Sequence, residues 1–338
     1  MFSFHDLAVP IVAAPMAGGP STPELVAAVA RAGGLGFLAA GYRLADEVAA
    51  QIRAVRTAGA EAFGVNVFVP ANPGPGVAAV GAYRQALRPM ADRYGVTLPE
   101  PVPDDDGWRT KIALLVDDPV PVVSFTFGLP GADVVEALHR AGSALVATVT
   151  GADEARAAAD RGMDALVVQG PLAGGHRATF DVAAPAPGQK LADLTAEVSR
   201  AGTLPWLAAG GLMTAVDVAA VITHGAVAAQ LGTAFLRCPE AGTSAVHRAA
   251  LADPRFEETV VTRCFSGRWA RGLRNDFVER YDTLAPAAYP AVNQVTGPLR
   301  RAAAAAGHAE HTHLWAGAGW RRGRDLPVKE LIAHLAPH

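Results

Sequence analysis

The chain has 338 residues, 51% of them hydrophobic, and a formal net charge of −3. This length and hydrophobic content suffice for one large domain or one domain with an appendage. No apolar run reaches the roughly 18 residues of a membrane-spanning helix, and the N-terminus lacks a basic region followed by an apolar one. The small net charge, with no basic run, excludes an electrostatic case for nucleic acid, and two cysteines are too few for a disulfide framework or metal cluster. We expect a cytoplasmic protein with neither a membrane nor nucleic acid as a partner.

Short runs of β-forming residues recur along the chain, with amphipathic segments of helical length in most of the intervals. The eight predicted strands cover residues 11–14, 35–38, 62–68, 122–125, 144–148, 165–168, 206–208 and 227–230. Alternating strands and helices predict a parallel sheet, and eight repeats predict a closed (β/α)8 TIM barrel. The competing fold is a doubly wound open sheet, but no G-x-G-x-x-G follows the first strand.

The spacing of the predicted strands breaks once, between Phe68 and Val122. A helix-like piece at residues 76–94 and a Pro- and Asp-rich piece at 98–107 indicate an insertion at about 69–109. After Leu236 the strand and helix alternation stops. We therefore expect a barrel at residues 1–236 and a mostly helical appendage at 237–338, packed near the mouth of the barrel.

Glycine-rich loops follow the seventh and eighth predicted strands, where barrels commonly hold phosphate. The first loop contains Gly210 and Gly211, and the second contains Gly232 and Thr233. Their amides and hydroxyl suit an anion, so together they favour a phosphate-bearing cofactor. Asn66 and Gln169, also at strand ends, offer the donor and acceptor edges that a flavin ring needs.

One histidine stands out, because His176 ends a glycine-rich turn directly after the sixth predicted strand. Glycines in such a turn allow close approach to a ligand, so its imidazole can reach into a cleft. An incidental histidine on a surface loop is the alternative interpretation. The position at the carboxyl end of a barrel strand favours a catalytic base.

The sequence resembles the class I nitronate monooxygenases, formerly called 2-nitropropane dioxygenases, along nearly its whole length. The matching stretches are residues 14–19, 64–68, 169–177, 208–211, 230–233, 267–277, 289–293 and 314–317. The resemblance implies a (β/α)8 barrel with FMN and an added helical domain. It also implies flavin contacts by eight residues, namely Met16, Asn66, Gln169, Gly174, Gly211, Gln230, Gly232 and Thr233.

The same resemblance implies that His176 is the catalytic base. Members of the family oxidise alkyl nitronates with O2 to a carbonyl compound and nitrite, and some first deprotonate neutral nitroalkanes. Removal of a proton from the carbon beside a nitro group needs a base with a pKa near the working pH, which a neutral imidazole supplies. The flavin takes one electron from the nitronate, and the protein orients the partners.

Two positions depart from the pattern expected of the family, Thr126 where histidine is expected and Ala318 where glutamine is usual. Threonine cannot serve as a cationic or basic partner, so the binding of nitronate or the substrate range should differ. Thr126, Tyr289 and Asn293 are the candidates for the substrate site, although Tyr289 and Asn293 are expected mainly to pack the appendage over the mouth.

Three other functions are considered. One is an FMN-dependent NAD(P)H:quinone or enoyl reductase, and another is a flavin-binding protein with degraded activity, suggested by Thr126. A dehydrogenase of the inosine-monophosphate type would need a nucleophilic cysteine after the sixth strand, and residues 169–180 contain none.

No metal site is predicted. His308, His311 and His313 form an H-x-x-H-x-H pattern, but it lies in a polar segment without a carboxylate or thiol framework. The expected partners are a small nitronate or nitroalkane and O2. The sequence leaves the oligomeric state open, a homodimer included.

Overall fold

The computed structural model describes residues 2–70, 74–186, 188–202 and 204–337. Eight parallel strands form a closed barrel in the order β1-β2-β3-β4-β5-β6-β8-β9. Their bounds are β1 (Ile11–Ala13), β2 (Leu35–Ala39), β3 (Phe63–Phe68), β4 (Val122–Thr126), β5 (Ala144–Val149), β6 (Ala165–Gln169), β8 (Trp206–Ala209) and β9 (Ala228–Leu231). The predicted (β/α)8 barrel and all eight predicted strands are confirmed.

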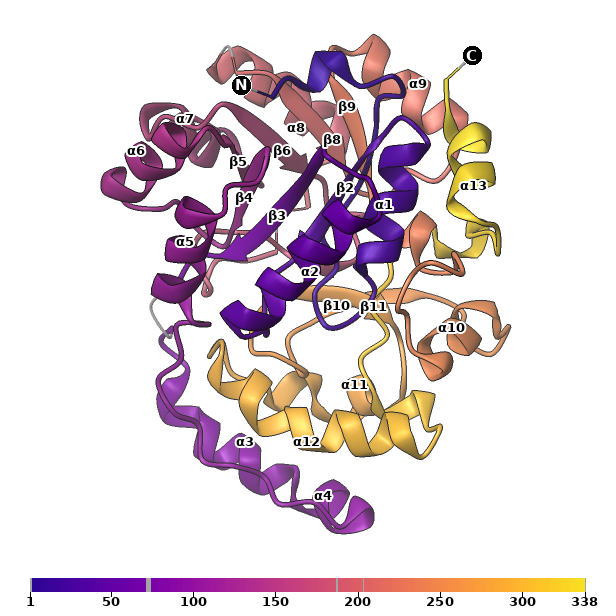
Figure 1. The fold of residues 1–338 in the computed structure, drawn as a ribbon. Coiled ribbons are helices and arrows are strands. Elements are labelled where there is room, and N and C mark those ends of the chain that lie inside the picture. Colours follow the sequence, from indigo (N-terminus) through magenta and orange to yellow (C-terminus); the bar gives the residue numbers. More distant parts are fainter. Residues whose placement is uncertain (1, 71–73, 187, 203, 338) are drawn as a thin grey trace.

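Helices surround the barrel (Figure 1). Those between the strands are α1 (Pro23–Arg31), α2 (Ala45–Thr57), α5 (Trp108–Asp117), α6 (Ala132–Ala141), α7 (Ala152–Asp160), α8 (Leu191–Ala201) and α9 (Ala215–Thr223). The first begins as its sequence predicts, because the Thr22 hydroxyl accepts from Leu25 N and Pro23 occupies the first helical position.

Two apolar layers hold the barrel together. Between strands and helices, the larger core includes Ile11 and Ala13, whereas Val12, which points the other way, belongs to the core that contains Phe37. Phe4, in the short 3-10 helix η1 (Phe4–Asp6), joins that second core. Gly64 makes room for Phe37, because a Cβ at position 64 would lie 2.2 Å from the Phe37 ring.

The C-terminal helix α13 (Val328–Leu335) packs against α1 and α9, so it takes the place of the helix missing after β9. Its Leu331 and Ile332 belong to the same core as the barrel strands. Figure 1 shows this helix beside α1 rather than with the other C-terminal helices. The predicted appendage at 237–338 therefore differs from the structure at its last helix, because an apolar stripe on α1 and α9 needs a cover there.

The rest of the C-terminal segment lies across one end of the barrel and combines with the insertion (Figure 1). Its helices are α10 (Ala245–Ala252), α11 (Asp276–Tyr281) and α12 (Ala291–Ala305), and those of the insertion are α3 (Val80–Ala86) and α4 (Arg88–Tyr94). Tyr83 and Met90 of the insertion share an apolar core with Phe277 and Leu299. Residues 71–73 of the predicted insertion lie outside the described residues.

A small antiparallel sheet, which the sequence did not predict, joins this appendage to the barrel. Its strands are β10 (Thr259–Thr262), β11 (Ala270–Leu273) and β7 (Gly175–His176), in the order β10-β11-β7. The short 3-10 helices of the region are η2 (Val77–Ala79), η3 (Thr233–Phe235), η4 (Asp282–Leu284), η5 (Ala309–His311) and η6 (Trp320–Arg322).

Candidate active site

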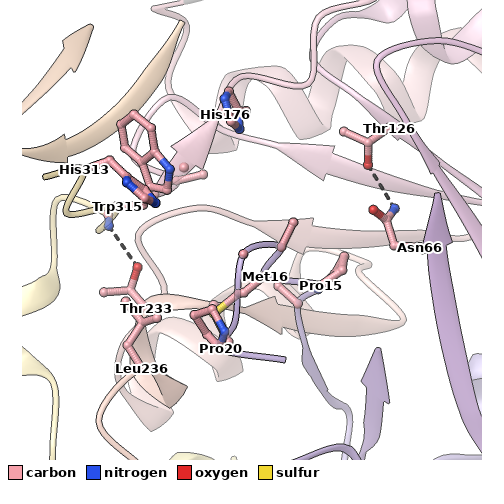
Figure 2. Close-up of a pocket in the computed structure, with 18 of the residues that line it drawn as sticks. Pro15, Met16, Pro20, Asn66, Thr126, His176, Thr233, Leu236, His313 and Trp315 are labelled. Carbon is pink, nitrogen blue, oxygen red and sulfur yellow. Dashed lines mark hydrogen bonds between the residues drawn. The ribbon is translucent and has the colours of Figure 1, made fainter. Parts of the chain in front are cut away.

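A cavity of about 700 Å³ lies where the carboxyl ends of the barrel strands meet the appendage. This volume falls within the usual range of small-molecule sites, roughly 300–1,000 Å³. Predicted site residues that line the cavity are Met16, Asn66, Thr126, Gln169, Gly174, His176, Gly211, Gln230, Gly232, Thr233 and Asn293. Figure 2 shows His176, Trp315, Met16 and Asn66 around this common space.

His176 is held on a strand and not on a free turn as expected. In β7, His176 pairs with Ala270 and Gly175 pairs with Arg271 of β11. The difference arises because the edge of β11 offers unpaired backbone groups to the segment that follows β6. A catalytic side chain on a paired strand is positioned more rigidly than one on a loop.

The neighbours of His176 assign a tautomer to its ring. Its Nε2 lies 2.9 Å from the Ser266 hydroxyl oxygen, and that hydroxyl donates its single hydrogen to the Arg268 carbonyl at 3.1 Å. We assign the hydroxyl hydrogen to this bond, so that Ser266 accepts from His176 and Nε2 carries the proton. The lone pair of Nδ1 is left as the basic atom of the ring.

The pKa of His176 is lowered from 6.5 to about 3, first by enclosure away from bulk water and then by the positive charges of Arg268 and Arg300. The imidazole is thus neutral at physiological pH, as a base must be. This pKa differs from the expected one near the working pH, because the ring is enclosed and two arginines distant from it in sequence act on it.

Gln169 supports the histidine from behind. Its Nε2 donates to the His176 carbonyl at 3.0 Å, and its Oε1 accepts from the Ala178 amide at 3.0 Å. Both ends of the side chain therefore hold the segment that carries His176. Gln169 still lines the cavity, and its predicted contact with a flavin stays a prediction.

Asn66 and Thr126 form a polar corner of the cavity (Figure 2). The Asn66 Nδ2 donates to the Thr126 hydroxyl at 3.0 Å and to the Ser124 hydroxyl at 2.9 Å. These bonds use the amide nitrogen and orient Oδ1 as an acceptor. Thr126 thus orients Asn66, a role that an uncharged hydroxyl can fill.

Two glycines of the cavity wall are packed so closely that a side chain would not fit without a shift. A Cβ on Gly174 would lie 2.4 Å from the Gly317 nitrogen, and one on Gly211 would lie 2.9 Å from Leu172 Cβ. Gly211 also has a φ of 81°, which glycine adopts without strain. The Thr233 hydroxyl accepts from Gly317 N at 2.9 Å, and Gly317 also packs against Gly174, so residue 317, beside Ala318, joins the loops after strands β6 and β9.

Arg300 brings a positive charge to the cavity wall. Its Nη2 donates to Asn293 Oδ1 at 2.7 Å, and its Nη1 lies 3.3 Å from His313 Nδ1. Because a guanidinium only donates, His313 must accept through Nδ1 and stay neutral. Burial, with the Arg300 charge as the next cause, keeps the pKa of His313 well below 6.5.

Aromatic rings form the wall beside His176. The ring centroids of Phe127, Tyr289 and Trp315 lie 5.7, 6.0 and 5.6 Å from that of His176. Arg268 stacks on Phe127 at 4.1 Å, which places its charge behind the wall. Tyr289 is therefore a buried supporting residue next to the cavity, whereas Asn293 lines it.

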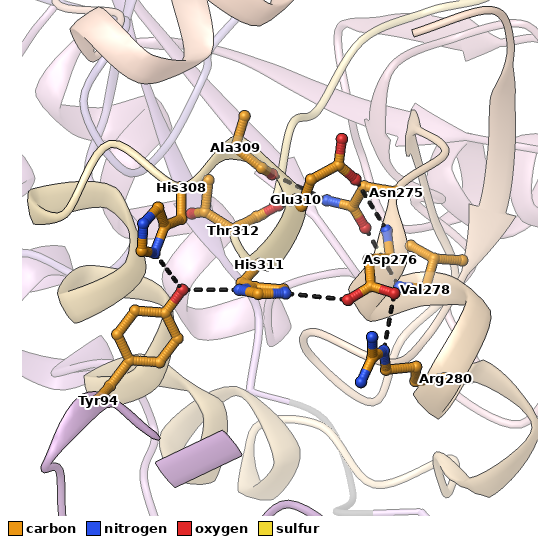
Figure 3. A network of polar contacts seen from close by, with 10 residues as sticks. All are labelled: Tyr94, Asn275, Asp276, Val278, Arg280, His308, Ala309, Glu310, His311 and Thr312. Atoms are coloured by element: carbon orange, nitrogen blue, oxygen red, sulfur yellow. Dashed lines mark hydrogen bonds and ion pairs between the residues drawn. The ribbon is translucent and has the colours of Figure 1, made fainter. Parts of the chain in front are cut away.

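The three clustered histidines do not converge. The Tyr94 hydroxyl lies 2.8 Å from His308 Nδ1 and 2.7 Å from His311 Nδ1, and His311 Nε2 lies 3.0 Å from Asp276 (Figure 3). His313 instead faces Arg300 in the cavity. Within the described residues, no group of three or more His, Cys, Asp or Glu side chains is arranged to hold a metal ion.

Comparisons with known proteins decide the family. A family model described as nitronate monooxygenase matches residues 3–338. A probable nitronate monooxygenase from Staphylococcus aureus (strain JH9) is 37% identical over 333 residues, 96% of this chain and 93% of that protein. The chain belongs to the nitronate monooxygenase family.

Solved structures agree with this assignment. The nitroalkane oxidase from Streptomyces ansochromogenes is 47% identical, with a TM-score of 0.93 over 98% of this chain and 95% of that chain. FabK from Thermotoga maritima is 26% identical, with a TM-score of 0.74 over 98% and 93%. The resemblance in the motifs is confirmed, and this member of the nitronate monooxygenase family is a flavin oxidoreductase.

Several residues at the cavity of this family member were not predicted from its sequence as site residues. Ser266 and Arg300 lie in segments whose position relative to the barrel depends on tertiary packing, and so does His313, which was considered only as a metal ligand. Tyr42 follows β2 but belongs to no motif. Ser266 stands one residue before the matching stretch 267–277, which was the only signal near it. In the part of the chain that the structure describes, no helix is long and apolar enough to span a membrane.

Proposed function

We propose that this protein uses FMN to oxidise alkyl nitronates with O2, giving a carbonyl compound and nitrite. The observation that carries the proposal is the neutral imidazole of His176 beside Arg300 on the wall of one cavity. A site with a positive charge and a neutral base favours an anionic substrate or one that becomes anionic on deprotonation.

The residues present fit FMN. We assign its phosphate to the loops that contain Gly211, Gly232 and Thr233, which line the cavity and in which a Cβ on Gly211 would lie 2.9 Å from Leu172 Cβ. The ring would lie against Met16 and Asn66, with Gln169, Gly174 and Gln230 around it. When bound, FMN would supply the one-electron chemistry that no side chain here can provide.

The protein's own residues bind and deprotonate the substrate. With a neutral nitroalkane, Nδ1 of His176 takes the proton from the carbon beside the nitro group, and the electron pair moves onto the nitro oxygens. The imidazolium then faces the nitronate that it has made, while Arg268 and Arg300 disfavour that imidazolium. We therefore expect preformed nitronates to be better substrates than neutral nitroalkanes.

Replacement of His176 by Asn tests the role of the base. The variant should retain FMN and lose activity on neutral nitroalkanes by about 100-fold or more, the usual contribution of a general base. Its activity on preformed nitronate should fall much less, because that substrate needs no deprotonation. Both rates are measured by oxygen consumption and nitrite formation.

His224→Asn is the matched control, because His224 is exposed at the end of α9, away from the cavity. It should leave both activities unchanged. Equal losses on both substrates in His176→Asn would contradict the role in deprotonation, and loss of flavin would show a binding role instead.

Two further assignments belong to the same proposal. We propose a cytoplasmic protein, in keeping with two cysteines that are both free and buried. The substrate class is a small nitronate or nitroalkane together with O2. The reductase alternative is distinguished by the oxidation of NAD(P)H in air, which the proposed enzyme should not catalyse at a comparable rate.

A further inference from the structure

Three non-glycine residues among those described have a left-handed backbone, and all belong to one corner of the molecule. Tyr42 has a φ of 65°, Asp106 of 57° and Phe127 of 77°. Tyr42 and Phe127 follow the strands β2 and β4 and line the cavity. Such backbone conformations are costly for bulky side chains and gather at functional sites, where the surrounding structure holds them.

Asp106 holds Tyr42 in this conformation. Its Oδ1 accepts from the Tyr42 amide at 2.8 Å, and its Oδ2 lies 2.7 Å from the Lys111 ammonium. Lys111 is only 1% exposed, so the ion pair is shielded from water on the lysine side. The end of the insertion thus fixes a loop of the barrel.

The fixed backbone places the Tyr42 hydroxyl among the substrate-site candidates. The Tyr289 hydroxyl donates to it at 3.2 Å, and the Tyr42 ring packs edge-on against Phe68 with centroids 5.4 Å apart. Because Tyr289 uses its hydrogen in this bond, Tyr42 keeps its own hydrogen to donate. Tyr42 is 42% exposed and lines the cavity, so its side chain is open to a ligand.

Positive charge also surrounds this hydroxyl. Tyr42, His176 and Arg300 line the same cavity, and Arg268 stacks on Phe127 of its wall. Beyond the effect of burial, the charges of both arginines lower the pKa of His176 and oppose the rise in the pKa of Tyr42, to which Asp106 adds. An anion with oxygen atoms would find there a phenolic donor, a neutral imidazole and the Arg300 cation, with the charge of Arg268 behind the aromatic wall. Hydrogen bonds to charged groups are the stronger kind, and a hydroxyl in a fixed position gains most from them.

We propose that Tyr42 is a substrate-binding residue, whose hydroxyl donates a hydrogen bond to an oxygen of the nitro or nitronate group opposite His176. Asp106 and Lys111 act through it as positioning residues. This assignment rests on the proposed function and adds to it the group that recognises the substrate's oxygen atoms. The left-handed backbone conformation of Tyr42 is unfavourable by itself, and it directs this hydroxyl toward the cavity.

Tyr42→Phe tests the proposal, because it removes the hydroxyl alone. With ethylnitronate as the substrate, KM should rise about 10-fold or more, the usual effect of losing a hydrogen bond to a charged group. The flavin content and the midpoint of thermal unfolding should not change. Unchanged kcat/KM would overturn the proposal.

Binding of sodium nitrite, followed through the absorbance of the bound flavin, gives a readout that does not depend on turnover. The affinity for nitrite should fall by a similar factor in Tyr42→Phe. Equal affinities, or no nitrite binding by the unaltered protein, would overturn the inference. An unaltered protein that binds nitrite but oxidises no nitronate would instead contradict the proposed function.

Two more variants separate binding from folding. Tyr83→Phe removes a hydroxyl that donates to the Cys264 carbonyl in the appendage core, so it should lower stability and leave the nitronate KM unchanged. Asp106→Ala should raise KM, and combining it with Tyr42→Phe should add little, because both act through one hydroxyl. Full additivity would show that Asp106 does not position Tyr42.

Discussion

The hydrogen bonds around His176 determine which of its ring nitrogens acts as the base. One hydroxyl hydrogen on Ser266 goes to a backbone carbonyl, and this places the imidazole proton on Nε2 and the lone pair on Nδ1. A second constraint of the same kind makes His313 an acceptor toward Arg300. In both imidazoles, the neighbouring groups therefore determine which ring nitrogen carries the proton.

Removal of the Ser266 hydroxyl should weaken this control. In Ser266→Ala, Nε2 loses its acceptor, so the ring can turn and take the other tautomer. We expect kcat for neutral nitroalkanes to fall about 3- to 10-fold, in line with the net value of one hydrogen bond. Preformed nitronate should be oxidised at nearly the same rate, with the same flavin content. An equal loss on both substrates would show that Ser266 does not act through the base.

At the scale of elements, the strands and helices of the barrel could be predicted from sequence, whereas the small antiparallel sheet and the position of α13 could not. Strand and helix periodicity are local, so residues 11–14 and 165–168 could be assigned from sequence alone. Strand β7 has only two residues, and its pairing with β11 depends on residues nearly a hundred positions later. The return of α13 to the barrel is likewise a long-range contact, which no local pattern near Val328 signals.

The residues of the candidate site also fall into those that could be predicted from sequence and those that could not. Their positions after barrel strands, together with the family motifs, predicted His176 and the glycine loops, all of which line the cavity. The orienting groups were missed, because Ser266 and Arg300 act across elements that are far apart in sequence. Tyr42 carried no motif, and its role became visible only through its backbone conformation.

At the scale of the whole molecule, enclosed neutral histidines make folding sensitive to acid. The pKa of His176 is lowered to about 3 and that of His247 to about 4, chiefly by burial, and that of His313 lies well below 6.5. In the unfolded chain each takes up a proton near pH 6.5. Below that pH the unfolded state binds more protons, so the free energy of unfolding decreases as the pH falls.

Each such histidine contributes a slope of up to about 1.4 kcal/mol per pH unit between pH 6.5 and its folded-state pKa. Urea unfolding at pH 7, 6, 5 and 4.5 measures this slope. His247→Gln should make it shallower by up to that amount, because one buried titrating group is removed. A slope identical to that of the unaltered protein would contradict the neutral, buried state of His247.

The most direct test of the central claim is the visible spectrum of the purified, flavin-loaded protein under anaerobic conditions. Addition of ethylnitronate should bleach the absorbance of the oxidised flavin, because the substrate donates electrons to it. A separate addition of NADH should leave that absorbance largely unchanged over the same time. Rapid bleaching by NADH with no change on adding nitronate would contradict nitronate oxidation and support the reductase.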